Sequence, residues 1–292
     1  MLWDYPRGGI PLTHFGVAFF PTDYSIQPVE LALALEEREL DSLYVTEHTH
    51  IPTSRQTPWP GGADLPEEYW HTHDPFVALA AAAAVTQRLR LGTGICLVVE
   101  RDPIQLAKAV ASLDVISGGR VVLGVGAGWN REEMENHGAI YDKRWAIVRE
   151  KVLAMKAIWT EDEPEFHGQF VDFDPLWSWP KPVQPGGPKV LIGAQSPWTW
   201  ERVTDYGDGW MPIGIRGGLE EGMADLRAQC ATTGRDFDSL DKAIFAAPAK
   251  PEEAKRLIEA GFTELTFSLP SVAAEKALPL LDRYAELARG LR

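Results

Sequence analysis

Cysteine and long apolar runs are scarce in this sequence. Cys96 and Cys230 are the two cysteines among 292 residues, and each lies in an apolar pattern, which indicates free thiols in a reducing compartment. No apolar run approaches the roughly 18 residues of a membrane span, and residues 1–9 lack the apolar core of a signal peptide. We therefore expect a cytoplasmic protein that does not bind membranes.

Positive charge is also in short supply. The chain has 28 Lys and Arg residues against 42 Asp and Glu residues, for a formal net charge of −14. Such a protein is poorly suited to phosphate backbones, so we expect no nucleic-acid partner. The G-x-S-x-G and C-x-x-C motifs are absent, which argues against serine hydrolase and dithiol chemistry.

Short apolar runs alternate with helical patterns along the whole chain. The runs are continuous, which is typical of strands buried on both faces of a parallel sheet. Prolines mark the helix starts, because the first helical residue needs no N–H; they are Pro28, Pro75, Pro103, Pro197 and Pro251. The predicted strands are residues 14–20, 42–47, 89–98, 121–126, 189–193, 209–213, 242–247 and 264–269.

Eight strand–helix units predict an α/β protein with the (β/α)8 TIM-barrel fold, as one domain over residues 1–292. An open doubly wound sheet is the rival, but it usually has fewer strands. Two long connections are insertions, residues 49–74 after the second strand and residues 161–188 after the fourth helix. The first leaves at the catalytic face and is predicted to be a mobile lid. The second is expected on the barrel bottom or against a partner subunit.

Small residues gather where the predicted strands end. Gly126, Ala127 and Gly128 follow the fourth strand, at the face where parallel α/β proteins bind ligands. Their spacing lacks the last glycine of the dinucleotide fingerprint, so it is weak evidence for NAD. After the fifth strand, Ser196 and Pro197 predict an N-cap and a first helical residue, and thus a helix terminus able to bind an anion.

Histidines near the end of the second strand are the main candidates for catalytic or metal-binding residues. His48 is the candidate acid–base or ring-polarising group, against the alternative of a structural histidine tied to a carboxylate such as Glu47. Two H-x-H pairs, His48 with His50 and His71 with His73, have metal-ligand spacing. The second pair is expected in a loop, and the other strand ends offer few ligands, so no metal site is predicted.

Several blocks of sequence resemble the luciferase-like monooxygenase superfamily, specifically its coenzyme F-420-dependent oxidoreductase branch. They are VTEH at 45–48, LGTGI at 91–95, LDVISGGRV at 113–121, GVGAGW at 124–129, FHG at 166–168, PKPV at 180–183 and GDGW at 207–210. The resemblance covers nearly the whole chain, and the family has the (β/α)8 fold that the strand pattern predicts.

The resemblance implies a flavin or deazaflavin lying across the barrel mouth. His48 matches the histidine near the reactive ring, Gly94-Ile95 a cis peptide beneath it, and 193–196 the phosphate loop. We expect cofactor contacts from Glu47, His48, Gly94, Ile95, Cys96, Gly126, Ala127, Gly128, Gly193, Ala194, Gln195 and Ser196. We expect substrate contacts from Trp59, Trp70 and Trp129.

The sequence departs from the family pattern at two places. The phosphate loop of the family usually contains a glycine pair, but the corresponding residues here are Gly193 and Ala194. Trp129 stands where the sugar-phosphate dehydrogenases of the branch carry a glutamate. The second departure argues against a sugar-phosphate substrate and leaves the proton donor unassigned.

Four functions are compatible with these features. The first is hydride transfer between coenzyme F-420 and a small organic substrate. The alternatives are an FMN-dependent monooxygenase using reduced flavin and oxygen, a metal-dependent barrel hydrolase, and a non-catalytic flavin-binding protein. A homodimer, and a reductase that supplies reduced cofactor, are the protein partners we expect. In the first two cases the cofactor would supply the redox chemistry and the protein the orientation.

Overall fold

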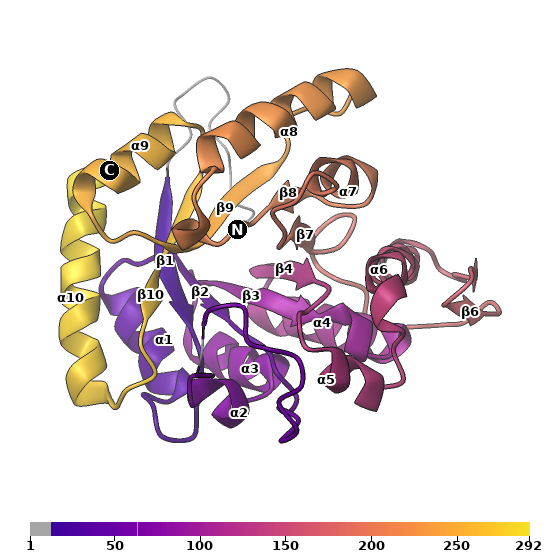
Figure 1. Cartoon of the computed structure of the whole chain (residues 1–292), viewed down its shortest axis with the longest axis horizontal. Helices are drawn as coiled ribbons and strands as arrows, with labels where there is room; N and C mark the ends of the chain where they lie inside the picture. The colour runs from indigo at the N-terminus through magenta and orange to yellow at the C-terminus, as the bar shows by residue number, and fades with distance from the viewer. Residues whose placement is uncertain (1–12, 63) are drawn as a thin grey trace.

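The computed structural model describes residues 13–62 and 64–292, and its central feature is a closed barrel of eight parallel strands (Figure 1). Around the barrel, the strands follow the order β1-β10-β9-β8-β7-β4-β3-β2. This confirms the predicted (β/α)8 fold and rules out the open sheet. The segment 1–9, where no signal peptide is expected, lies outside the described residues, and the single-domain assignment stays a prediction.

The barrel strands agree with the predicted ones to within one or two residues, except at the sixth position. They are β1 (His14–Phe19), β2 (Ser42–Val45), β3 (Arg90–Leu97), β4 (Val121–Gly126), β7 (Lys189–Ile192), β8 (Gly209–Trp210), β9 (Asp241–Ala247) and β10 (Glu264–Leu269). The strand predicted over 209–213 stops at Trp210. Pro212 has no N–H to continue the ladder, although Ile213 regains an isolated bridge to Phe245.

Most of the helices cover the outside of the barrel, while α2 and α5 lie in connections that follow β2 and β4. They are α1 (Pro28–Glu37), α2 (Glu68–His71), α3 (Pro75–Val85), α4 (Pro103–Ser117), α5 (Arg131–Asn136), α6 (Arg144–Thr160), α7 (Thr199–Asp205), α8 (Leu219–Thr233), α9 (Pro251–Glu259) and α10 (Ala274–Leu291), with 3-10 turns η1 (Val98–Glu100), η2 (Tyr141–Lys143) and η3 (Gly214–Arg216). Four of the five predicted proline starts are confirmed, at α1, α3, α4 and α9.

Two predictions about helices are wrong. The helix expected to begin at Pro197 begins at Thr199, with Trp198 in the cap position. The reason is a turn in which Thr199 N–H binds the Ser196 carbonyl and the Ser196 N–H binds Thr199 Oγ1, both at 2.9 Å. His71, expected in a loop, is the last residue of α2.

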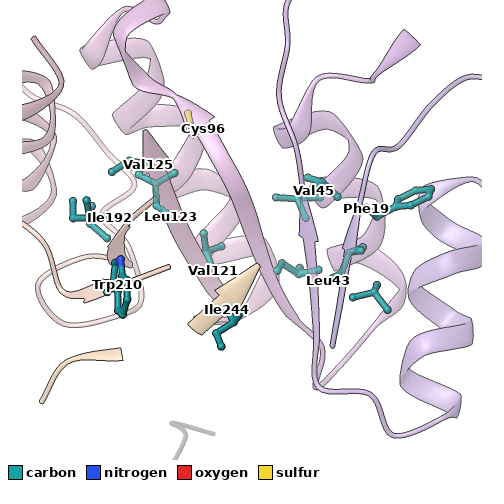
Figure 2. Close-up of a cluster of buried hydrophobic side chains, with 14 of the residues drawn as sticks. Phe19, Leu43, Val45, Cys96, Val121, Leu123, Val125, Ile192, Trp210 and Ile244 are labelled. Carbon is teal, nitrogen blue, oxygen red and sulfur yellow. The ribbon is translucent and has the colours of Figure 1, made fainter. Parts of the chain in front are cut away.

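Side chains alternate between two apolar layers, as the period of a strand requires. Leu43, Val45, Leu123 and Val125 point toward the helices and belong to the large core seen in Figure 2. Alternate residues point into the barrel, where Tyr44, Val122, Leu191, Met211 and Ala243 form a smaller cluster with Ile95 and Phe245 against it. In the described part of the chain, no helix is long and apolar enough to cross a membrane.

The insertion at residues 161–188 carries the small hairpin β5 (Phe166–His167) and β6 (Asp172–Phe173), which projects beyond α6 in Figure 1. Its last part reaches the amino-terminal end of the strands, because Gln184 Nε2 donates to the Val121 carbonyl at 2.8 Å. For this last part of the insertion, the expected position at the barrel bottom is confirmed. Asp114, fully buried in α4, accepts hydrogen bonds from Val183 N, Gln184 N and Gln184 Nε2 at 2.7, 3.0 and 2.7 Å.

We expect Asp114→Ala to destabilise the fold by about 2–4 kcal/mol, because it leaves buried donors without their charged acceptor. Urea unfolding measures the loss. The control is Asp225→Ala, at an exposed position of α8, for which we expect a change within about 0.5 kcal/mol. Equal effects of the two substitutions would contradict the anchoring role of Asp114.

Candidate active site at the barrel mouth

His48 lies just beyond the end of β2 and is bound to a buried carboxylate of α5. Its Nδ1 lies 2.8 Å from Glu133 Oε2, and the two side chains are 7% and 1% exposed. The other oxygen, Glu133 Oε1, accepts the Thr49 N–H at 3.1 Å. The carboxylate that binds His48, which the structural alternative placed at a neighbour such as Glu47, is therefore Glu133, 85 residues away. The acidic start of α5 was visible in the sequence, but nothing in it pointed to His48.

A layer of side chains continues outward from this pair. Thr49 Oγ1 lies 2.7 Å from His137 Nε2 and 2.9 Å from His50 Nδ1, while Asn136 Nδ2 lies 2.8 Å from His50 Nε2. Thus His48 and His50 contact different partners and do not converge on one point. Across residues 13–62 and 64–292, no group of three or more His, Cys, Asp or Glu side chains is arranged to hold a metal ion.

Aromatic rings from the first insertion pack against His48 and Trp129. The Tyr69 ring centroid lies 5.1 Å from that of His48 and 6.5 Å from that of Trp129, and Trp59 lies 5.8 Å from Tyr69. The insertion therefore covers the catalytic face, as predicted, although its mobility stays a prediction. Trp70 instead makes a tilted ring contact with His71 and is 50% exposed, so Tyr69 takes the position expected for Trp70.

Glu47 and Cys96 lie behind the mouth rather than in it. Glu47 Oε2 accepts the Leu97 N–H at 2.7 Å, and Oε1 accepts Arg101 Nε at 2.5 Å, so this carboxylate ties β3 to the end of β2. Cys96 is fully buried in the outer core, and burial raises the pKa of its thiol well above the usual value. Neither side chain is placed for a ligand at the mouth, in contrast to what the strand-end positions suggested.

Ile95 occupies the centre of the strand ends. The predicted cis peptide between Gly94 and Ile95 is confirmed, and the register of β3 with β4 shifts between Thr93 and Cys96. A Cβ atom added at Gly126 would lie 2.1 Å from Ile95 Cδ1, and one at Gly193 2.4 Å from Ile95 Cγ2. These two glycines therefore make room for Ile95, which is a packing reason for part of the small-residue pattern. Ala127 is buried beside them, and Gly128 has a positive φ of 69°.

The loop at 193–196 combines hydrogen-bonding groups with a cation. Arg202 Nη1 lies 3.4 Å from Ser196 Oγ, and the Arg202 guanidinium stacks on Trp145 at 3.9 Å. The Ala194 carbonyl accepts a hydrogen bond from Trp210 Nε1, and Gln195 Nε2 donates one to the Gly217 carbonyl. Gln195 Oε1 is buried without a partner in the described structure. The predicted anion site thus gains Arg202, which sequence reasoning missed.

A model of the luciferase-like monooxygenase family matches residues 25–291, and the chain belongs to this family. It is 40% identical over 275 residues to an uncharacterised protein of Mycobacterium tuberculosis, an alignment that covers 93% of this chain and 97% of that one. The F-420-dependent oxidoreductases are among its homologues and structural neighbours.

Characterised relatives use two kinds of cofactor. An F-420-dependent glucose-6-phosphate dehydrogenase of Nocardia farcinica is 30% identical, covering 74% of this chain and 62% of its own. An FMNH2-dependent dimethylsulfone monooxygenase of Pseudomonas putida is 28% identical, in an alignment that covers 64% of this chain and 52% of that one. A solved F-420-dependent secondary alcohol dehydrogenase with an F-420–acetone adduct has the same fold, with a TM-score of 0.78 and 18% sequence identity. The superposition covers 96% of this chain and 99% of that one.

We expect Gly193→Ala to destabilise the protein by about 1–3 kcal/mol, because its Cβ would overlap Ile95. The same substitution in an Ile95→Ala background should cost much less, which a double-mutant cycle of unfolding free energies measures. Gly290→Ala, with open space around its Cβ, is the control. Additive effects of the Gly193 and Ile95 substitutions would argue against the contact.

Proposed function

We propose that the protein transfers a hydride between coenzyme F-420 and a small organic substrate at the barrel mouth. The observation that carries this proposal is the buried His48–Glu133 pair, which faces the aromatic rings of Tyr69 and Trp129. The F-420-dependent relatives support this cofactor. We further propose a cytoplasmic location and a homodimeric state, and a separate reductase or dehydrogenase that restores the cofactor.

The residues at the mouth fit a flat cofactor with an anionic tail. Ile95 would support one face of the ring, since its side chain stands over Gly126 and Gly193. Ser196 and Arg202 would bind the phosphate, and the unpartnered Gln195 Oε1 would accept a hydrogen bond from a hydroxyl or ring N–H. When bound, the deazaflavin supplies a carbon that accepts or gives a hydride.

His48 supplies the proton chemistry in this proposal. A carboxylate at Nδ1 favours the tautomer that carries its proton on Nδ1, which leaves Nε2 as the acceptor. For a substrate hydroxyl that is oxidised, Nε2 takes the hydroxyl proton, and Glu133 stabilises the resulting imidazolium. In the reverse direction Nε2 returns the proton. Trp59, Tyr69 and Trp129 exclude water and give the substrate an apolar wall.

An FMN-dependent monooxygenase is the second candidate, because the family also contains an FMNH2-dependent member related to this chain. The same anion-binding loop suits the FMN phosphate. In that case a reductase partner delivers the reduced flavin. The metal-dependent hydrolase has no ligand set in the described residues, since His48 binds Glu133 and His50 contacts Asn136.

We expect the protein to bind F-420 more tightly than FMN, as measured by fluorescence titration. Arg202→Met should weaken binding by about tenfold or more, because a charge-assisted contact with an anion is lost. Arg149→Met, on the exposed face of α6, should leave the dissociation constant unchanged. Tighter binding of FMN, by tenfold or about 1.4 kcal/mol, would favour the monooxygenase instead.

We expect His48→Ala to lower kcat by about 10²–10⁴-fold, the usual contribution of a general acid or base. Glu133→Gln should lower kcat by about tenfold or more with a smaller effect on KM, because the amide cannot stabilise the imidazolium. Asn136→Ala, on the same helix but in contact with His50, serves as the control. Wild-type kcat in the His48 variant would make His48 a structural residue.

A further inference from the structure

A third carboxylate, Glu100, is buried behind the mouth without a hydrogen-bond partner. It ends η1, directly after β3, and its side chain is 1% exposed. Neither carboxylate oxygen has a partner in the described part of the chain. His137 Nε2 lies 3.8 Å from Glu100 Oε2, which is beyond hydrogen-bond distance. An ionised carboxylate in this position would carry a large desolvation cost.

The charges around Glu100 favour its protonated form. Glu133 and Glu47 are ionisable neighbours of the same sign. The two cations nearby already have other partners. Arg101 binds Glu47 and Asp74, and Lys151 Nζ donates to the Val99 and Arg101 carbonyls at 2.9 and 2.6 Å. Burial first, then repulsion from Glu133 and Glu47, raises the pKa of Glu100 to about 9, against the smaller opposing effects of Arg101 and Lys151.

His137 connects Glu100 with both the solvent and the catalytic pair. Its side chain is 29% exposed, and burial, followed by the nearby His50, lowers its pKa. His137 Nε2 also lies 2.7 Å from Thr49 Oγ1, and the Thr49 N–H binds the Glu133 carboxylate that holds His48. The cluster therefore extends from the surface, through His137 and Thr49, to His48.

We propose that Glu100 stores a proton behind the barrel mouth at neutral pH, that it exchanges this proton with solvent through His137, and that its ionisation is transmitted through His137 and Thr49 to the His48–Glu133 pair. In the exchange, His137 turns from Thr49 toward Glu100, Oε2 gives its proton to Nε2, and Nδ1 releases a proton to water. One proton leaves and no electrons move. Glu100 contacts no substrate in this scheme and acts on His48 only through the residues between them. The catalytic consequence rests on the proposed function, whereas the proton store does not.

The first test follows the ring signals of His48 and His137 by NMR from pH 5 to pH 10, in the full chain without added cofactor. In the wild type, both rings should show an inflection near pH 9 when Glu100 ionises. Glu100→Gln should abolish it. Glu135→Gln, at an exposed carboxylate of α5, should retain it. Absence of the inflection from the wild type, or its survival in Glu100→Gln, would overturn the proposal.

The second test uses stability and applies to the same unliganded chain. Between about pH 4.5 and pH 9, the folded protein holds a proton that the unfolded chain has lost, so this group makes stability fall as pH rises. Glu100→Gln should therefore raise Tm more at pH 8 than at pH 5. Glu100→Met, which leaves no unsatisfied amide, should show the same pH dependence. A Tm change that is equal at both pH values in both variants would contradict the stored proton.

Turnover provides a third measurement that separates the two proposals. If F-420-dependent turnover is found, the wild-type rate should have an alkaline limb near pH 9 that Glu100→Gln removes and Glu135→Gln keeps. Failure to find any turnover would count against the proposed function, while the NMR and stability results would still decide the proton store. An unchanged alkaline limb in Glu100→Gln would overturn the coupling of Glu100 to His48.

Discussion

The carboxylate of Glu133 is the contact on which the barrel mouth depends. Its two oxygens bind consecutive residues, His48 Nδ1 and the Thr49 N–H, and so fix the end of β2 against the first turn of α5. The helix is in turn capped by Asn130, whose side chain accepts the Glu133 N–H at 3.2 Å. Because the Glu133 side chain is almost fully buried, losing either partner would leave a charge in an apolar site.

Three carboxylates behind the mouth illustrate how an acidic protein accommodates negative charge in its interior. Glu47 is neutralised by Arg101, and Glu133 is bound to His48 and a backbone N–H. Glu100 has neither kind of partner, and a proton takes that role in our proposal. The loop at 193–196, for which we propose anion binding, lies beside α7 instead, where Arg202 approaches Ser196. In our proposals, the proton chemistry and the anion-binding groups therefore lie at different strand ends.

The sequence determined the fold because the signals for it are local and repeated. Continuous apolar runs identify buried parallel strands, and prolines at first helical positions identify four helix starts. Where a local signal competed with a nearby contact, the prediction failed. The Ser196-Pro197 pair suggests a helix start, but Thr199 binds the Ser196 N–H and a turn forms first. The strand predicted over 209–213 ends at Trp210 instead, because Pro212 cannot continue the backbone hydrogen bonds of the sheet.

The composition of the site was decided partly by the sequence and partly by tertiary structure. The sequence placed His48, Ile95, Trp129 and the 193–196 loop at one face, because all parallel strands end on the same side of a barrel. It could not show that Glu133 holds His48, that Tyr69 rather than Trp70 reaches the mouth, or that Gly193 accommodates Ile95. These contacts join residues far apart in the chain, and side-chain directions there depend on how the strands and insertions pack in three dimensions.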